Sequence, residues 1–161
     1  MNYHIHKTYT VDEAKARLEQ YCAYRERCHK EVTQKLQQMR MIPEAIDQVL
    51  LHLLQHDFLN ETRFAKAFAR GKFKTKKWGK YRITRELKAR DISAYNIKKA
   101  LQEISEEAYR STFEELVAKR MEQLQTETNL QKKRKKLTDY LLYRGWDREW
   151  VYQTAFNLEK G

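Results

Sequence analysis

The residues best suited to chemistry in this sequence are cations in its middle, with aromatic side chains among them. Between residues 63 and 90 there are twelve Lys and Arg residues and one acid, Glu86, so this segment carries the whole net charge of +11 of the 161-residue chain. Lysine and arginine neutralise phosphates, and an aromatic ring can stack on an unpaired base. The sequence therefore predicts a binding surface for a polyanion or an acidic partner.

The predicted binding residues form two runs. The first begins with a basic connection tipped by an aromatic residue, made of Lys72, Lys74, Lys76, Lys77 and Trp78, and continues with Lys80. Placing Ile83 and Leu87 inward at about 100° per residue then turns Tyr81, Arg82, Arg85 and Lys88 to the exposed side of one helix. Arg82, Arg85 and Lys88 are all expected outside the core. The alternative is that these residues bind no partner and form a solvated surface, with Trp78 packed inside the protein. The second run is Lys132, Lys135 and Lys136, and its alternative is a solvated face partly offset by acids.

Residues for catalysis or metal binding are sparse. His52 and His56 are four apart, a spacing that can hold zinc on a helix, but no third ligand is evident and no Glu lies between them in the protease pattern. The sequence has no glycine loop for phosphate and no nucleophile motif around a histidine. We predict no enzyme activity, no metal and no cofactor; a helical enzyme with carboxylates from distant residues is the remaining alternative, which metal analysis tests.

Composition restricts the elements that can position these residues. Four Gly and one Pro leave little to punctuate strands and turns, so the chain is expected to be nearly all helix. The hydrophobic share of 41%, with six Phe, ten Tyr and three Trp, supplies cores and argues against disorder. No apolar run approaches the roughly 18 to 20 residues of a membrane helix, and the start has no secretory stretch. We expect a cytoplasmic protein with no membrane contact.

One apolar pattern occurs three times, which indicates a repeat. Its five positions are spaced 4, 5, 5 and 4 residues apart, and this template is filled by Val32, Leu36, Met41, Ile46 and Leu50, then by Ile83, Leu87, Ile92, Ile97 and Leu101, then by Leu137, Leu141, Trp146, Val151 and Ala155. Each copy is typical of two helices joined by a short turn. Gly145 stands where a left-handed turn residue is expected, whereas the equivalent Arg40 and Asp91 close their turns less comfortably.

A further amphipathic stretch precedes each pair of helices, at residues 11–24, 61–73 and 107–124. Thr10 with Glu13, and Asn60, are suited to cap the first two of these helices. The predicted fold is all-α, with three tandem three-helix modules forming an elongated body, straight or curved. Its parts are a flexible leader at 1–9 and modules at 10–56, 57–105 and 106–161, the second of them basic.

These residues resemble the RecX family of regulatory proteins over residues 12 to 156. Its central signature is matched by the run Asp57-Phe58-Leu59-Asn60-Glu61-Thr62-Arg63-Phe64-Ala65, by Gly79-Lys80-Tyr81-Arg82-Ile83, and by Glu86-Leu87 with Ile92. The structural residues of this signature are Phe58, Leu59, Phe64, Ala65, Gly79, Ile83, Leu87 and Ile92. The flanks Tyr24-Arg25, Lys35-Leu36, Tyr140-Leu141 and Arg144-Gly145-Trp146 resemble the first and third repeats of the family. Asp57 and Asp91 depart from the family, which commonly has glycine there, and this affects turn geometry more than surface chemistry.

The resemblance implies regulation of the RecA recombinase. Such proteins lie in the groove of the RecA filament on single-stranded DNA, slow its growth and restrain its ATPase and strand exchange, within DNA recombination, DNA repair and the SOS response. We expect from it a non-enzymatic monomer whose partners are the RecA filament, single-stranded DNA and, weakly, double-stranded DNA. The alternative is a freestanding DNA- or RNA-binding helical module that acts without RecA.

Overall fold

The computed structural model describes residues 7–159, and within them the backbone forms nine α-helices, one π-helical segment and no strand. The helices are α1 (Val11–Tyr24), α2 (His29–Gln38), α3 (Pro43–Gln55), α4 (Glu61–Gly71), α5 (Lys80–Ala89), α6 (Ala94–Leu101), α7 (Glu106–Gln123), α8 (Leu130–Tyr143) and α9 (Arg148–Phe156), with η1 (Lys72–Lys76) directly after α4. The predicted all-α fold is confirmed. Residues 1–6 of the predicted leader lie outside the described part, while Tyr9 packs against the core of the first helices.

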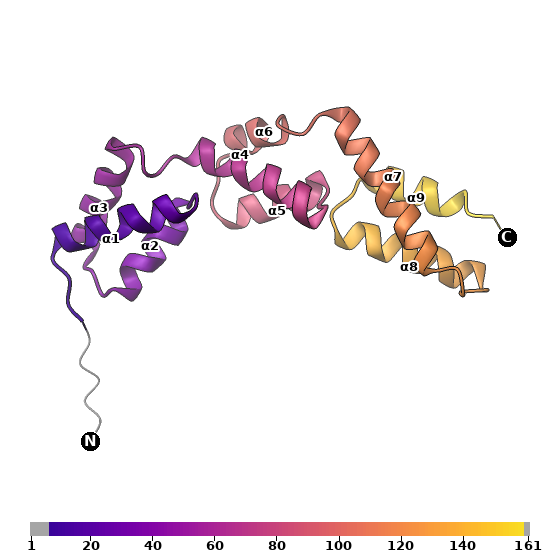
Figure 1. Cartoon of the computed structure of the whole chain (residues 1–161), viewed down its shortest axis with the longest axis horizontal. Helices are drawn as coiled ribbons and strands as arrows, with labels where there is room; N and C mark the ends of the chain where they lie inside the picture. The colour runs from indigo at the N-terminus through magenta and orange to yellow at the C-terminus, as the bar shows by residue number, and fades with distance from the viewer. Residues whose placement is uncertain (1–6, 160–161) are drawn as a thin grey trace, which may run out of the picture.

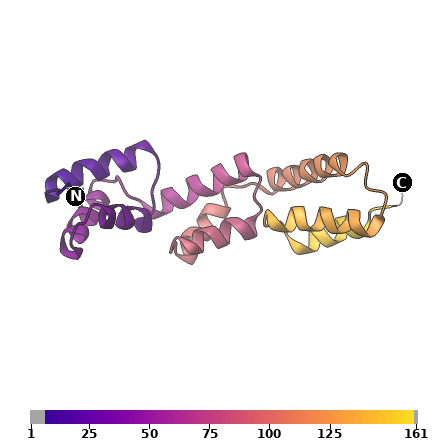
Figure 2. The same cartoon turned by 90° about the horizontal axis from the view of Figure 1, so that it is seen from below.

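The helices form three consecutive groups of three, arranged in a row. Within residues 7–159, the extensive helix contacts join α1 and α2 to α3, α4 and α5 to α6, and α7 and α9 to α8. Figure 1 shows the groups side by side along the long axis, with the first and third groups at opposite ends. In Figure 2 the first helices, α1, α4 and α7, follow one edge of the molecule and the remaining pairs follow the other. The body is elongated, as predicted, and the module boundaries at residues 57 and 106 stay a prediction.

Side-chain caps fix where most of the expected helices begin. Thr10 and Glu13 form the predicted capping box, with each side chain accepting the backbone N–H of the other residue at 3.1 Å. Asn60 accepts the Arg63 N–H at 2.9 Å and so starts α4. Asp147 stands at the start of α9 but makes no cap bond there. Its carboxylate has a different partner, which belongs to the junction described below.

The turn between the second and third helix has the same geometry in all three groups. Arg40, Asp91 and Gly145 have φ angles of 61°, 59° and 83°, which is the left-handed region that favours glycine. In each turn the N–H of the third template residue donates to the carbonyl of the second, from Met41 to Leu36, Ile92 to Leu87 and Trp146 to Leu141, at 3.1 to 3.2 Å. The sequence expectation for these turns is confirmed, and two of them place a non-glycine residue in a conformation that costs L-residues free energy.

The connection after α4 differs from its prediction. The sequence predicts a helix over 61–73 followed by an open basic connection, but α4 passes at Gly71 into the π-helical segment η1. The Thr75 hydroxyl donates to the Gly71 carbonyl at 2.7 Å inside this segment. Lys77 then reverses the chain with a left-handed φ of 57°. The lysines at 72, 74 and 76 are therefore held on a helical turn instead of a loop.

The apolar template residues build two cores. Twelve of the fifteen are buried, and Met41, Leu50 and Leu101 are half-buried. One core lies within the first group and includes Leu18, Leu36 and Leu53. The other runs without interruption through the second and third groups, and Cys28 from the first group joins it. The second and third groups thus support each other through shared apolar packing, as expected for units too small to bury a large core alone.

Candidate functional site

Four of the twelve central cations are paired with carboxylates. Lys66 and Arg70 share Glu103 at 3.6 and 3.5 Å, and Arg90 contacts Glu86 one turn away at 3.1 Å. The fourth, Arg63, belongs to a separate cluster described below. Pairing reduces the field that these four residues can offer to an external anion, so they are weak candidates for binding.

Three more cations of this segment lie over aromatic rings. The Lys72 ammonium is 5.2 Å from the centre of the Trp78 ring, and the Lys80 ammonium is 4.7 Å from that of Tyr109. The Arg82 guanidinium is 4.2 Å from the Trp78 ring and 4.6 Å from the Tyr143 ring. Cation–π contacts of this kind are worth about 0.5 to 2 kcal/mol each. These cations therefore have a structural partner in the folded chain.

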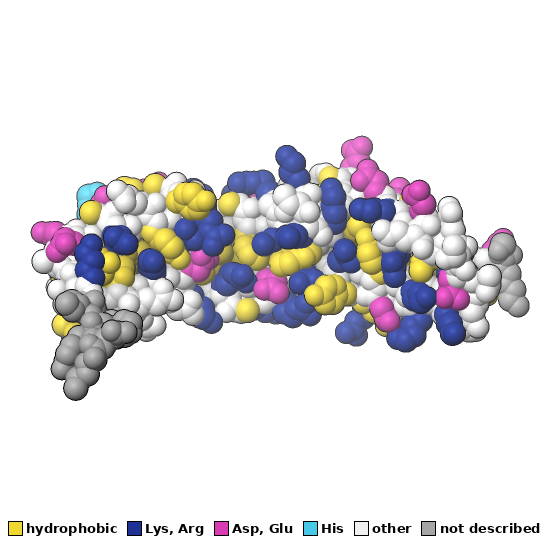
Figure 3. Space-filling view, turned by 60° about the horizontal axis from the view of Figure 1, so that its bottom comes forward, with side chains coloured by type: hydrophobic (Ala, Val, Ile, Leu, Met, Phe, Trp, Pro, Cys, Tyr) yellow, Lys and Arg dark blue, Asp and Glu magenta, His cyan; other side chains and the backbone are white. Residues whose placement is uncertain are grey.

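The five remaining cations have neither an ion pair nor a ring contact among residues 7–159. They are Lys74, Lys76, Lys77, Arg85 and Lys88, and all except the half-buried Lys77 are exposed. Figure 3 shows Lys and Arg side chains across the middle of the molecule, beside exposed apolar side chains. We call these five residues the free cation set. They are the central cations of the predicted binding surface that are available to a partner.

Trp78 and Arg82, both predicted for binding, also make contacts within the folded chain. Trp78 is half-buried against the shared core, with its ring 6.2 Å from that of Phe68. Arg82 is not a free member of the outward stripe, because its guanidinium lies over two rings and donates to the Tyr143 carbonyl at 3.1 Å. Arg82 thus has partners within the chain that Arg85 lacks, since α5 packs against the third group on that side, and its role in binding stays a prediction.

The start of α5 docks on the turn between α8 and α9. The Gly79 N–H donates to the Arg144 carbonyl at 2.8 Å, and the Tyr81 N–H donates to the Gly145 carbonyl at 3.1 Å. The Trp146 indole N–H reaches back to the Lys77 carbonyl at 3.0 Å. Backbone groups that a helix start leaves unpaired are thus satisfied by the neighbouring group. This junction fixes the orientation of α5 and of the free cations on it.

Tyr109 of α7 completes this junction. Its hydroxyl accepts the Lys80 N–H at 3.0 Å and donates to the Asp147 carboxylate at 2.6 Å, which is why Asp147 does not cap α9. Burial and the bond to Asp147 raise the pKa of Tyr109 above its ordinary value of 10.0. The hydroxyl is therefore neutral near pH 7 and serves as a hydrogen-bonding link between α5, α7 and α9.

The second predicted run lies on α8 and is largely neutralised. Lys132, Lys135 and Lys136 are exposed, as expected. Lys135 pairs with Asp139 at 2.9 Å and Lys136 pairs with Glu127 at 2.8 Å, so the acids nearby offset two of the three charges. Lys132 is left without an ion pair among the described residues. The central segment is therefore the stronger candidate surface.

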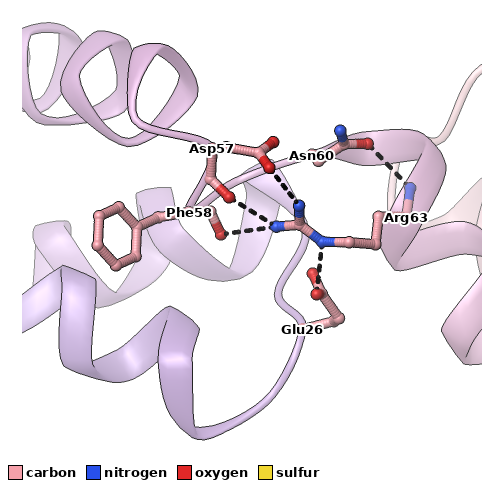
Figure 4. Close-up of polar contacts among 5 residues, drawn as sticks. All are labelled: Glu26, Asp57, Phe58, Asn60 and Arg63. Carbon is pink, nitrogen blue, oxygen red and sulfur yellow. Dashed lines mark hydrogen bonds and ion pairs between the residues drawn. The ribbon is translucent and has the colours of Figure 1, made fainter.

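Arg63 holds the first and second groups together, which the sequence did not indicate. Its guanidinium donates to the Glu26 carboxylate at 2.6 Å and to the Asp57 carbonyl at 2.9 Å, and it pairs with the Asp57 carboxylate at 3.0 Å. Figure 4 shows the side chain of Arg63 reaching from α4 to Glu26, between α1 and α2, and to Asp57, between α3 and α4. The bond to Glu26 and the nearby acids raise the pKa of Arg63 despite its partial burial. The family signature residues beside it are buried except Phe58, which is half-buried.

His52, His56 and the two cysteines have ordinary surroundings. His52 contacts the Glu19 carboxylate at 2.6 Å, and its ring lies 4.5 Å from that of His56. Across residues 7–159, no group of three or more His, Cys, Asp or Glu residues is suited to hold a metal ion. Cys22 and Cys28 are free and buried, and burial raises the pKa of Cys22 to about 11 and also raises that of Cys28. Both thiols are therefore protonated near pH 7.

No helix in the described part of the chain is both long and apolar enough to span a bilayer. The fold and the site define an all-α helical-repeat protein with a basic surface at its middle. A family model for the second three-helix domain of RecX matches residues 60–101, the segment that holds Arg63 and the whole free cation set. Over most of its length the chain is similar to the RecX family of regulatory proteins.

Individual relatives and a solved structure show the extent of this similarity. The regulatory protein RecX of Oceanobacillus iheyensis is 25% identical over 143 residues, which are 89% of this chain and 50% of that protein. RecX of Listeria monocytogenes is 32% identical over 88 residues, which are 55% of this chain and 33% of that protein. The chain thus spans about half the length of the curated relatives it matches. The fold is shared with a RecX crystal structure from Lactobacillus salivarius, with a TM-score of 0.75, 20% identity and coverage of 91% of this chain and 94% of that one.

Proposed function

We propose that this protein is a non-enzymatic cytoplasmic regulator that binds the RecA recombinase filament on single-stranded DNA and inhibits its ATPase, strand exchange and growth. The observation that carries the proposal is the match of the RecX second domain to residues 60–101. Within that segment, Arg85 and Lys88 of α5 remain free to contact a polyanion or an acidic protein surface.

The row of three helix groups suits a filament as a partner. A helical filament offers the same surface repeatedly, and an elongated body can contact more than one protomer. Each contact then raises the effective concentration of the next, so several weak contacts give a stable complex. The shared core of the second and third groups keeps their surfaces in fixed relation.

The test is the ATPase of RecA on single-stranded DNA with sub-stoichiometric amounts of this protein. We expect inhibition, and its loss in the double variant Arg85→Glu/Lys88→Glu, because both cations are exposed and unpaired within residues 7–159. The matched control is Lys98→Glu/Lys119→Glu, which makes the same change in charge at two exposed lysines outside the free cation set. Absence of inhibition by the wild-type protein over a wide concentration range contradicts the proposal.

The second candidate function is binding of single-stranded nucleic acid without RecA, and the free cation set favours it. Log affinity would then fall with log salt by about 0.7 per phosphate contacted, and by about 3.5 if all five cations contact phosphates. Filter binding or fluorescence polarisation from 50 to 300 mM salt measures this slope. Weak binding to bare strands together with strong binding to the RecA filament favours the first function over the second.

A further inference from the structure

A cleft of about 590 Å³ lies beside the free cations of α5, at the junction of the second and third groups. Five residues of α5 line it, together with Leu101 at the end of α6 and Asp147 at the start of α9. The α5 residues are Lys80, Tyr81, Thr84, Arg85 and Lys88. Because the docking of α5 on the α8–α9 turn fixes these elements, the cleft is a preformed feature of the junction.

The lining of this cleft combines a flat apolar wall with unpaired positive charge. Tyr81 is 65% exposed, so one side of its ring is open to a ligand, and Leu101 adds apolar surface. Tyr81, Arg85 and Lys88 occupy positions i, i+4 and i+7 of α5 and therefore share one face of the helix. The ring and the two cations are thus adjacent along the cleft.

Trp78 and Asp147, which lie near these groups, are already engaged with other residues of the chain. Trp78, the other aromatic residue of the predicted surface, is packed against Phe68 and Arg82. The Asp147 carboxylate accepts the Tyr109 hydroxyl. A phosphate is repelled by Asp147, so it is expected toward Arg85 and Lys88, which leaves the wall formed by Tyr81 and Leu101 for an uncharged group.

The chemistry of this lining selects among anionic ligands. An acidic peptide offers carboxylates but no flat group to cover the Tyr81 ring. A duplex offers phosphates, but its base faces are stacked inside the helix and cannot reach the ring. A single strand offers both a phosphate and an unstacked base, and base stacking on an aromatic side chain is a common mode of single-strand binding.

We propose that this cleft holds one unstacked nucleotide of a single strand, with its base against Tyr81 and Leu101 and its phosphate at Arg85 and Lys88. This inference deepens the proposed function and rests on it for the choice of a nucleic acid as the polyanion. Under this proposal Tyr81 contributes to binding by stacking and not by charge. Removal of its uncharged ring should therefore weaken binding to single strands.

The test measures binding of labelled oligothymidylate to the full chain by fluorescence polarisation, without RecA. Tyr81→Ala is expected to weaken this binding about 5- to 100-fold, while Tyr81→Phe retains it because stacking needs only the ring. Tyr95→Ala is the matched control, since Tyr95 is 67% exposed on α6 and lies outside the cleft. An oligonucleotide of abasic sites is expected to bind wild type and Tyr81→Ala equally.

Two results would contradict the proposal that the cleft binds a nucleotide. One is unchanged binding of oligothymidylate by Tyr81→Ala, and the other is an equal loss for abasic and normal strands. The RecA ATPase assay separates this inference from the proposed function. Inhibition of RecA together with Tyr81-independent strand binding overturns only the cleft, whereas Tyr81-dependent strand binding without inhibition of RecA overturns only the regulatory role.

Discussion

Gly79 at the start of α5 lies directly against Gly145 in the turn between α8 and α9. A Cβ atom on Gly79 would be 2.4 Å from the Gly145 carbonyl oxygen, and a Cβ atom on Gly145 would be 2.3 Å from the Cβ of Arg82. No side chain fits between these two backbone segments without displacing one of them. The close approach allows the N–H groups of Gly79 and Tyr81 to reach carbonyls of the third group, and so joins two helix groups into one body.

Adding a methyl group at this contact is expected to destabilise the protein. Gly145→Ala places a side chain at a φ of 83° as well as in the clash, and we expect a loss of about 2 to 5 kcal/mol. Gly79→Ala, with an ordinary φ of −78°, is expected to lose about 1 to 3 kcal/mol. Urea unfolding followed by circular dichroism measures both. Gly71→Ala is the control, because a Cβ there meets nothing within 4 Å, and equal stability of the Gly145 and Gly71 variants would contradict the argument.

Alanine substitutions at Arg82 and Arg85 are expected to have different effects, the first on stability and the second on polyanion binding. Arg82→Ala removes two cation–π contacts and a hydrogen bond to Tyr143, so the free energy of unfolding is expected to fall by about 1 to 3 kcal/mol. Arg85→Ala removes an exposed side chain and is expected to change stability by less than about 0.5 kcal/mol while weakening polyanion binding. Thermal melts and polarisation assays on the same samples distinguish the two. Equal melting temperatures for the two variants would show that the ring contacts contribute little.

The apolar template predicts the fold because its spacing records how the chain turns. Leu36, Leu87 and Leu141 lie in the last turn of the second helix of each group, and their carbonyls accept the N–H of the residue five positions later. That hydrogen bond closes each helix and turns the chain toward the next one. The fixed spacing of five residues at this point therefore marks the same turn in each group. Helix periodicity predicts the helices on either side of it.

Contacts between distant residues are what the sequence could not reveal. Arg63 and Glu26 are 37 residues apart, and Arg82 contacts the Tyr143 carbonyl across 61 residues. Counting charges places both arginines in one basic segment, although pairing and stacking remove them from the available surface. Periodicity assigns a residue to a face of its helix, but only the packing of groups shows whether that face meets solvent or a neighbour.

The left-handed residue Arg40 offers a stabilising substitution. Its φ of 61° is unfavourable for any side chain, and it is exposed without an ion pair in residues 7–159. Arg40→Gly is expected to raise the free energy of unfolding by up to about 1 kcal/mol, because relief of the strain exceeds the added entropy of the unfolded chain. Arg40→Ala keeps the strain and is expected to give no gain. Urea midpoints check the pair, and equal stability of the two variants would contradict the role of the φ angle.

Glu61 is expected to make stability depend on pH below neutrality. Its partial burial would raise its pKa, but hydrogen bonds from Asn96 and the Ser93 N–H outweigh this, and the pKa is lowered from the ordinary 4.5. A carboxylate with a lowered pKa stabilises the folded state above its unfolded pKa, and this contribution is lost as the pH falls through the folded pKa. Glu61→Gln should therefore reduce stability at pH 7, with a difference from wild type that shrinks as the pH falls below about 4.5. Urea midpoints between pH 7 and pH 3 measure the difference, with Glu114→Gln as an exposed control. A difference that stays constant down to pH 3 would show that the charge of Glu61 is not what holds α4 to the start of α6.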